Sequence, residues 1–528
     1  MDRRTLLAIT LSFAIFVLWQ KFYLEPMTTP RNAPVATQAV PPPSASAPQL
    51  PTGQGIQAAP EVPKSSADRP HQELTLESGT GKVLLNNGAY LLSGWDLKGY
   101  RLGIAADTAG VDLRAVTHQD GEVLLGFDAP SLAYLNQQKG DLTTTPQGAV
   151  WSYEDANVSL RREIQTGADQ NFLDVKIEAK FKTAAPRFAF VSINSQSIAD
   201  DPEAVDRQLL YWTKQDIERV QASDVKEVQD VQTPVKYIGA ASRYFLLAVV
   251  SQGLDPRGLL QPAGSGAGRM SLAYPISGDT ISIPLRVYFG PKELETMRSA
   301  EPLLDHTVDF GWFTAFAYPL LKLLKWFYKY VENYGIAIIL LTLLLKIVTY
   351  PLTYKSMKSM KDMAKIQPQL QRVREKYKDD KEALNREMLT LMRSHGYNPM
   401  AGCLPILIQM PIFFALYRVL YSSIELYHAP FALWILDLSS KDPYYVTPVL
   451  LSATMFIQQS LTPTTAMDPT QAKMMKMMPL IFGAMMFALP SGLTLYMLVN
   501  AIASIAQQLV LNKKLGITPN AAPTPAKG

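Results

Sequence analysis

The chain has 528 residues, of which 48% are hydrophobic, and a formal net charge of +4. This length exceeds what one ordinary core supports, so at least two structural units are expected. Cys403 is the single cysteine, which excludes a disulfide scaffold, and the small net charge alone says little about partners.

Residues 1–24 are predicted to form a transmembrane anchor. A short basic start is followed by an apolar run from Thr5 to Trp19. No small-x-small cleavage site follows this run, so we expect an uncleaved anchor that leaves Arg3 and Arg4 in the cytoplasm. A cleaved signal peptide is the alternative.

Residues 25–70 are predicted to be an extended linker. Eleven prolines occur between positions 26 and 70, among many Ala, Ser, Thr and Gln residues. Such a composition cannot bury enough apolar surface to fold. The linker leads to the first large domain.

Residues 71–308 are predicted to form an antiparallel β-sandwich. Short stretches of alternating apolar and polar residues recur there, at 82–85, 122–127, 172–181 and 281–289. The polar stretch 203–230 is expected to hold a loop or a short helix. The domain sequence has no metal-binding cluster, nucleophile motif or phosphate loop, so we predict neither a metal or cofactor site nor an enzyme activity.

Residues 309–332 are predicted to form an amphipathic helix in the membrane interface. One helical face is apolar and consists of Phe316, Leu320, Leu323, Leu324 and Phe327. Another face carries Lys322, Lys325 and Lys329. This pattern is typical of a helix that lies along a membrane surface. A helix packed on the soluble domain is the alternative.

Residues 333–511 are predicted to contain five membrane spans. Their approximate ranges are 334–354, 401–422, 445–461, 477–490 and 491–511. The third and fourth are short for a bilayer, which needs about 20 residues. Lys and Arg concentrate in the loop 355–398, whereas the loop 423–444 has only Lys441. The positive-inside rule therefore places both termini and the tail 512–528 in the cytoplasm, and residues 71–308 outside.

Lys346 lies inside the strongly apolar run 335–351. A cation at the centre of a membrane helix costs about 2.5–3.5 kcal/mol on insertion scales, and such residues tend to face a bundle interior or a wet cavity. Lys346 is therefore a candidate functional residue. The alternative is that its side chain extends to the nearby basic loop and has no role.

The basic loop 355–398 is predicted to be a helical hairpin. Apolar residues recur at helical spacing on both sides of Asp379 and Asp380. Its candidate partner surface consists of Lys361, Lys365, Arg372, Arg374 and Lys378. These charges suit anionic lipid, ribosomal RNA or a protein partner. The alternative is that they serve the positive-inside rule alone.

Several segments resemble the YidC/Oxa/Alb family of membrane protein insertases. The most specific are Asn398–Tyr417, Ala429–Leu438, Asp442–Tyr445 and Pro490–Tyr496. The segment Thr349–Leu352 is similar to part of the family's second span. The resemblance runs along the chain and is weakest in the linker. The large outer domain is similar to that of the Gram-negative YidC type.

The resemblance implies a polytopic α-helical membrane protein with six transmembrane helices, one N-terminal anchor and a five-helix insertase core. It also implies a large periplasmic all-β supersandwich domain. The implied function is insertion and folding of nascent membrane proteins in the inner membrane. A hydrophilic groove, open to the cytoplasm and to lipid, would receive the substrate.

The resemblance also implies site residues and partners. The family's groove arginine aligns with Lys346, which keeps the charge but loses the bidentate fork. Thr342 aligns with a groove-lining residue, and Tyr496 matches one member of a tyrosine pair whose second position is Met497. Gln409 and Gln458 are further polar candidates. The implied partners are the Sec translocon (SecYEG and SecDF type), and the signal recognition particle receptor and ribosome at the cytoplasmic loops.

Two other classes of function remain open on the sequence. One is a channel or secondary transporter in which Lys346 binds a small anion. The other is an anchored periplasmic binding protein, with carbohydrate as one candidate ligand. No internal repeat or broken-helix pair in the sequence favours the transporter.

Overall fold

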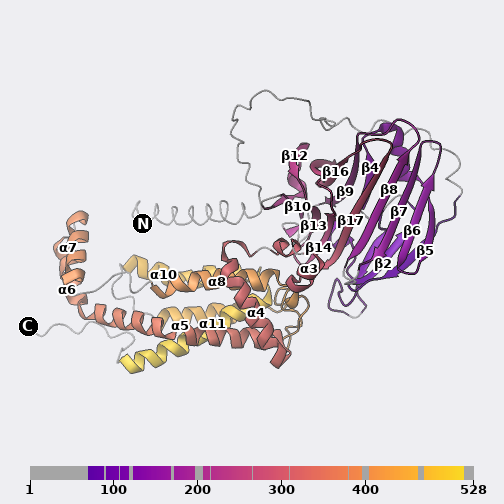
Figure 1. The fold of residues 1–528 in the computed structure, drawn as a ribbon. Coiled ribbons are helices and arrows are strands. Elements are labelled where there is room, and N and C mark those ends of the chain that lie inside the picture. Colours follow the sequence, from indigo (N-terminus) through magenta and orange to yellow (C-terminus); the bar gives the residue numbers. More distant parts are fainter. Residues whose placement is uncertain are drawn as a thin grey trace, which may run out of the picture. The chain divides into compact units, whose positions relative to one another are not determined.

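The structure, a computed structural model, describes most of residues 69–515. The gaps are at 89–90, 106, 118–122, 168–171, 197–205, 214–215, 265, 302, 309, 378–379, 395–403 and 462–468. The predicted anchor 1–24, nearly all of the linker and most of the tail lie outside the described residues. The described residues form two compact units that divide after residue 309 (Figure 1).

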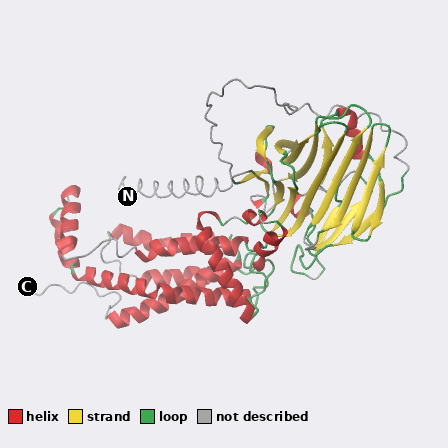
Figure 2. Cartoon of the chain, in the orientation of Figure 1, coloured by secondary structure: helices red, strands yellow, loops and turns green. Residues whose placement is uncertain are grey.

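The first unit is built mainly of β-strands (Figure 2). The strands are β1 Glu73–Glu77, β2 Gly81–Asn86, β3 Gly94–Leu97, β4 Val123–Phe127, β5 Asp141–Thr145, β6 Gly148–Glu154, β7 Val158–Thr166, β8 Leu173–Phe181, β9 Phe188–Gln196, β10 Gln208–Trp212, β11 Ile217–Gln221, β12 Gln229–Pro234, β13 Tyr237–Ala241, β14 Phe245–Ser251, β15 Arg257–Gly264, β16 Ala267–Pro275 and β17 Thr280–Pro291. Its short helical elements are α2 Arg114–Thr117, η2 Pro130–Gln137, η4 Ala222–Asp224, α3 Leu294–Ala300 and η5 Leu304–Thr307.

The strands form three antiparallel sheets. The largest has nine strands in the order β11-β10-β13-β14-β17-β8-β7-β6-β5. A five-stranded sheet has the order β12-β15-β16-β9-β4, and β1, β2 and β3 form a third sheet. Strands β10 and β13 of the large sheet contact β16 and β9 of the five-stranded sheet. The described β unit is therefore a layered antiparallel structure, as the sequence predicted.

Residue alternation explains why these segments are strands. In β8, Leu173, Val175 and Ile177 point inward while the charged residues between them point outward. This period of two is what a strand with one buried face requires. In β14 all residues are buried, which fits a strand covered on both faces. The predicted alternating stretches correspond to β2, β4, β8 and β17.

The prediction for residues 203–230 was wrong for most of the described stretch, which holds strands, although it does contain one short helix. The described part of this stretch holds β10 and β11, with η4 after them and the start of β12. Leu209 and Leu210 of β10 are buried, and β10 pairs with both β11 and β13. Tertiary pairing at the end of the large sheet therefore overrides the polar composition of the segment.

The second unit is helical (Figure 2). Its elements are η6 Gly311–Phe313, α4 Thr314–Val331, α5 Tyr334–Lys365, α6 Gln367–Lys376, α7 Lys381–Ser394, α8 Leu404–Ser422, η8 Ile424–Leu426, α9 Val446–Leu461, α10 Pro469–Met486 and α11 Ser491–Leu515. Helix α11 packs against α5 and α9, α10 packs against α9, and α4 packs against α5 and α8. The hairpin predicted in the basic loop corresponds to α6 and α7.

Two helices differ most in length from the predicted spans. Helix α5 continues through Pro351 to Lys365, because prolines are tolerated in such helices when hydroxyls and neighbours satisfy the backbone. The Thr349 hydroxyl, for example, donates to the Leu345 carbonyl at 2.8 Å. Helix α10 begins at Pro469 and ends at Met486, so it is longer at its start than the predicted span 477–490.

Helix α4 is amphipathic, and part of its predicted apolar face packs against protein. The buried residues are Ala317, Leu320, Leu321 and Leu324. Phe316 of the predicted apolar face is exposed, which is compatible with the predicted contact of that face with the membrane interface. It is exposed because α4 packs on both α5 and α8 through small and leucine side chains, which leaves aromatic residues outside.

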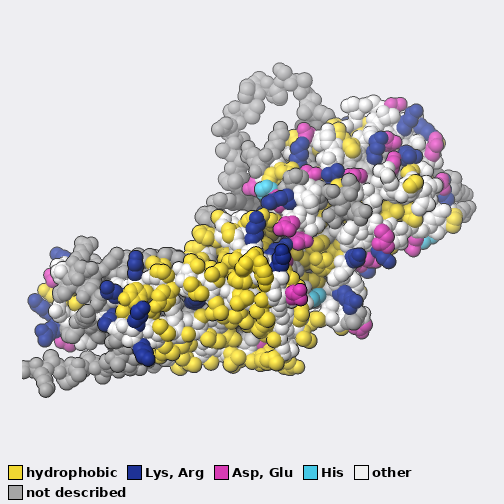
Figure 3. Space-filling model, turned by 60° about the horizontal axis from the view of Figure 1, so that its bottom comes forward, with side chains coloured by type: hydrophobic (Ala, Val, Ile, Leu, Met, Phe, Trp, Pro, Cys, Tyr) yellow, Lys and Arg dark blue, Asp and Glu magenta, His cyan; other side chains and the backbone are white. Residues whose placement is uncertain are grey.

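The helical unit has an apolar outer surface. Figure 3 shows hydrophobic side chains spread over the helices, with Lys and Arg gathered at the end that carries α6 and α7. Two described helices, α5 over Tyr334–Ser359 and α11, are long and apolar enough to cross a membrane. Val446–Leu461 and Met477–Met486 are shorter apolar segments. An apolar exterior of this kind fits a lipid environment.

Candidate functional site

Lys346 lies on α5 and points its ammonium group at α11. Its Nζ donates a hydrogen bond to Ser504 Oγ at 2.7 Å. The Ser504 hydroxyl in turn donates to the Asn500 carbonyl of its own helix at 2.7 Å. An ammonium group has three N–H donors. Within the described part of the chain, Ser504 is the one hydrogen-bond partner of this group, and no carboxylate lies within ion-pair distance of it.

Ser504 belongs to a polar stripe on α11, which consists of Tyr496, Asn500, Ser504 and Gln508. These residues recur every four positions, so they lie on one helical face. Gln508 donates to the Leu461 carbonyl at the end of α9, at 2.9 Å. The stripe therefore faces the neighbouring helices rather than the apolar exterior.

The other predicted groove residues do not hydrogen-bond the Lys346 ammonium. Thr342 is buried one turn earlier on α5, and its hydroxyl donates to the Ile338 carbonyl at 2.7 Å. Tyr496 lies two turns before Ser504, about 12 Å along the helix. Its buried hydroxyl makes no hydrogen bond of regular geometry, although Gln409 of α8 lies beside it. Gln458 is half-buried on α9.

Sequence reasoning missed Asn500, Ser504 and Gln508. Their signal was available, because four polar residues at a spacing of four interrupt an otherwise apolar helix. The sequence does not reveal the hydrogen-bond partner of Lys346, because Ser504 is distant from it along the chain. Polar side chains in membrane helices are expected to face other helices and to hydrogen-bond across them.

One end of the helical unit is closed by the loop 423–445, which joins α8 to α9. At its centre the buried Asp437 accepts four hydrogen bonds. Oδ1 accepts from the Ser439 backbone N–H at 2.7 Å and from its hydroxyl at 2.6 Å. Oδ2 accepts from His428 Nδ1 at 2.8 Å and from the Ser440 hydroxyl at 2.6 Å. Burial raises the pKa of Asp437, but the hydrogen bonds from His428, Ser439 and Ser440 hold it below its usual range.

The same loop is attached to the start of α11. The Ser491 hydroxyl donates to the Asp437 carbonyl at 2.7 Å, and its backbone N–H donates to the Ser440 carbonyl at 2.7 Å. The Gly492 N–H donates to the Leu438 carbonyl at 2.9 Å. These bonds tie the loop to the turn between α10 and α11, so this end of the unit is covered by hydrogen-bonded backbone.

A second carboxylate joins the loop to α9. Asp442 Oδ2 accepts from both the Thr447 N–H and the Thr447 hydroxyl at 2.7 Å. Thr447 lies 3.1 Å from the Thr494 hydroxyl of α11. Burial raises the pKa of Asp442, while its hydrogen bonds with Thr447 and the Tyr444 N–H hold the pKa below the usual range. Asp442 thus caps the start of α9.

The loop and α4 are joined by an ion pair. Lys325 of α4 lies 3.4 Å from Glu425, whose side chain is 9% exposed. The predicted basic face of α4 is therefore engaged in part by the helical unit itself. Glu425 is structural in this arrangement.

Comparison with known proteins identifies the family. The model of the 60Kd inner membrane protein matches residues 326–518, and that of the YidC periplasmic domain matches residues 134–323. A membrane protein insertase YidC from Geobacter metallireducens is 36% identical over 98% of this chain and 99% of its own length. The chain belongs to the YidC family of membrane protein insertases.

Other relatives agree. The YidC insertase of Nitratidesulfovibrio vulgaris is 36% identical over 97% of this chain, and that of Geotalea daltonii is 53% identical over 45% of it. A solved structure of an active YidC insertase matches 83% of this chain and 92% of its own length, at 19% identity and a TM-score of 0.36. The predicted family is confirmed, with a β-rich periplasmic domain and a helical region of apolar helices.

The predicted partner surface of this YidC-family chain is described only in part. Lys361 donates to the Leu515 carbonyl, so it caps the C-terminal end of α11 and is a structural residue. Arg372 is exposed on α6. The side chains of Lys365 and Arg374, and the whole of Lys378, lie outside the described residues.

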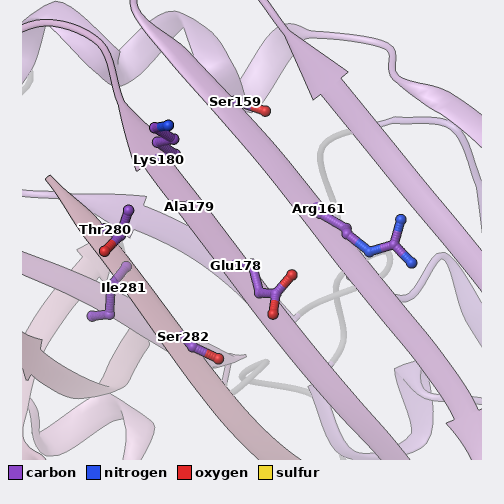
Figure 4. A pocket seen from close by; sticks show the side chains of 8 residues that line it. All are labelled: Ser159, Arg161, Glu178, Ala179, Lys180, Thr280, Ile281 and Ser282. Atoms are coloured by element: carbon purple, nitrogen blue, oxygen red, sulfur yellow. The ribbon is translucent and has the colours of Figure 1, made fainter.

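The periplasmic domain has an open hollow of about 440 Å³ on β7, β8 and β17 (Figure 4). Its polar lining includes Arg161 and Glu178, which lie side by side on paired strands. Arg161 also lies 3.7 Å from Glu163, and Glu178 lies 2.6 Å from Lys176. The charges are therefore balanced along the strands. Among the described residues, no group of three or more His, Cys, Asp or Glu is placed to hold a metal ion.

Proposed function

We propose that this chain inserts nascent membrane proteins by attracting an acidic hydrophilic segment of the substrate to Lys346. The observation that carries the proposal is a cation in an apolar helix whose one described partner is the neutral hydroxyl of Ser504. Burying a cation without a counter-ion is costly. Water or a substrate carboxylate would use the two remaining N–H donors of the ammonium group.

The surface around Lys346 supports a lateral exit into lipid. Ile347 and Val348 follow Lys346 directly on α5, and they are 70% and 67% exposed. The charge therefore points toward α11 while the adjacent apolar side chains point outward. A substrate whose polar tail is held at Lys346 would place its apolar segment along this outer surface. Burial of that segment in lipid would supply the driving force.

The two ends of the helical unit support one direction of entry. The hydrogen-bonded loop 423–445 covers one end, whereas Lys and Arg gather at the end with α6 and α7 (Figure 3). By the positive-inside rule the basic end is cytoplasmic. The polar stripe of α11 runs from Tyr496 toward that end. We propose a groove that is wet from the cytoplasm and closed by the loop on the periplasmic side.

The proposed topology has six transmembrane helices, with both termini in the cytoplasm. The proposed domains are the anchor 1–24, linker 25–70, periplasmic domain 71–308, interfacial helix 309–332, insertase core 333–511 and tail 512–528. The proposed partners beyond the substrate are the Sec translocon, the signal recognition particle receptor and the ribosome. Of the predicted partner-surface residues, Arg372 on α6 is described and exposed, and its guanidinium suits an anionic partner.

Photocrosslinking tests the groove assignment. A benzoylphenylalanine would replace Asn500, which is half-buried in the polar stripe, or Ile502, which is 52% exposed on the same helix. A ribosome-arrested nascent chain with an acidic tail would be offered to membranes that carry each variant. We expect the tail to crosslink to position 500 and not to position 502. Equal crosslinking from both positions would refute the groove.

A further inference from the structure

Strained backbone is concentrated at the periplasmic end of the helical unit. Among the described residues, the non-glycine residues with positive φ are Glu332, His428, Leu433 and Tyr445. His428, Leu433 and Tyr445 lie in the loop 423–445. Glu332 immediately precedes Asn333, whose side chain donates to the Phe431 carbonyl of that loop at 2.9 Å. Strain of this kind persists only where the surroundings enforce it, and it clusters at functional positions.

The strained loop presents large apolar side chains outward. Leu433 is 82% exposed, and the apolar rim consists of Leu433, Leu436, Tyr444 and Tyr445, all exposed. Around Leu433 the backbone is closed, because the Phe431 N–H donates to the Ile435 carbonyl at 3.0 Å and the Ile435 N–H donates to Ala432 at 3.1 Å. The exposure of Leu433 is therefore a fixed feature of the loop.

Within residues 429–445 the exposed charge has one sign. Between residues 429 and 445 the carboxylates are Asp437 and Asp442, and both are buried in hydrogen bonds. Lys441 is the exposed charge of this stretch. Residues 429–445 thus present apolar tips, tyrosines and a cation, and no carboxylate of this stretch is exposed; the exposed carboxylate next to the loop is Glu332, at the end of α4. Tyrosine and lysine are the residues that anchor proteins at the headgroup level of a bilayer.

The rim is continuous with the apolar outer surface of the helices. The rings of Tyr445 and Phe487 lie 5.3 Å apart, and Phe487 follows directly on α10. Val449 on α9 and Met485 on α10 are also exposed. The loop itself joins the ends of α8 and α9, so the chain connectivity keeps it at the membrane boundary.

We propose that the apolar rim inserts into the outer leaflet of the inner membrane, at the boundary between headgroups and acyl chains. The strained turn at Leu433 holds the side chain in position for this contact. The proposal depends on the helical unit spanning the membrane and not on the role of Lys346. Its failure would therefore leave the proposed insertion mechanism standing.

Depth-dependent quenching tests the proposal on the full chain in liposomes of phosphatidylcholine and phosphatidylglycerol. Cys403→Ser removes the single cysteine, and Leu433→Cys then carries a nitrobenzoxadiazole dye. Ile481 of α10 is 66% exposed, and Ile481→Cys is the control for a dye in lipid. Lys82→Cys on β2 is the control for a dye in water. Leu436→Cys gives an independent reading should the Leu433 variant fail to reconstitute.

Iodide on both sides of the liposomes and lipids with shallow or deep nitroxides would quench each dye. We expect the dye at position 433 to be several-fold less sensitive to iodide than the dye at position 82. We also expect it to be quenched more by shallow than by deep nitroxides. Iodide sensitivity equal to that at position 82 would overturn the proposal. Protection from both quenchers would overturn it too, because that result means a protein covers the rim.

Discussion

Substitution of Asp437 tests whether hydrogen bonds hold the loop 423–445 rigid. Asp437→Ala removes the acceptor of four donors, of which the N–H and the hydroxyl of Ser439 are buried and cannot turn to water. Each buried donor left unsatisfied costs about 1–3 kcal/mol. Two such groups would cost about 2–6 kcal/mol, and we expect local opening of the loop to become easier by roughly 3 kcal/mol, in the lower half of that range because the loop can relax around the gap.

Asp437→Asn should have a smaller effect. Its carbonyl oxygen can still accept from Ser439, and the Ser440 hydroxyl and His428 ring can reverse their roles toward the amide. We expect a cost of about 1 kcal/mol, the value of one ordinary hydrogen bond. Lys441→Ala is the matched control, because Lys441 is exposed in the same loop.

Hydrogen exchange measured by mass spectrometry would report local opening without requiring two-state unfolding of the whole chain. The amides of Leu438, Ser491 and Gly492 are the reporters, because all three are bonded across the loop. We expect their exchange to accelerate about 100-fold in the Ala variant and about fivefold in the Asn variant. An Ala variant that exchanges like Lys441→Ala would refute the reasoning.

Further predictions concern the groove, helix packing and pH. Ser504→Ala should reduce insertion of an acidic-tailed substrate about threefold to tenfold, because a hydrogen bond in a membrane is worth about 1 kcal/mol. Ser504→Thr keeps the hydroxyl and should retain insertion. Equal insertion by both variants would contradict the role of the Lys346–Ser504 bond. Gly335→Ala should destabilise the contact of α5 with the loop by about 1–3 kcal/mol, because a Cβ there would lie 2.0 Å from the Phe431 ring. A melting temperature equal to that of the control Ile336→Ala would contradict this prediction. Because the pKa of Asp437 is lowered on folding, its stabilisation is fully present above the unfolded value of about 3.9 and is lost as the pH falls through the lower folded value. The hydrogen-exchange rate of the loop amides, corrected for its intrinsic pH dependence, should therefore stay constant down to about pH 5. If exchange accelerates at lower pH to the same extent in the wild-type chain and in Asp437→Asn, this carboxylate is not the cause.

The sequence predicted those features that depend on local periodicity. The period-two pattern of β8 and the long apolar run of α5 each identify an element from neighbouring residues alone. The same approach failed at β10 and β11, where the pairing of β10 with β11 and with β13, and not composition, decides the structure. For α4 the sequence does not say which apolar residues pack on protein: Leu320 and Leu324 are buried, whereas Phe316 is exposed.

The sequence identified the charged residue of the candidate site but not the residues that contact it. Lys346 is conspicuous because a cation interrupts an apolar helix, and that anomaly is local. Its partner Ser504 comes from α11, and only the packing of α11 against α5 brings the two together. The loop 423–445, which covers one end of the helical unit, depends likewise on side-chain hydrogen bonds of Asp437 and Asp442, which hydrophobic periodicity does not encode.

The most direct test of the account is insertion into proteoliposomes that contain this chain alone. The substrate would be a single-span protein with a short acidic tail, scored by protease protection against empty liposomes. The wild-type chain, Lys346→Ala and Lys346→Arg would be compared. The account predicts insertion that is lost with Ala and retained with Arg, because the charge at position 346 is what attracts the tail. Insertion that is unchanged by Lys346→Ala would contradict it.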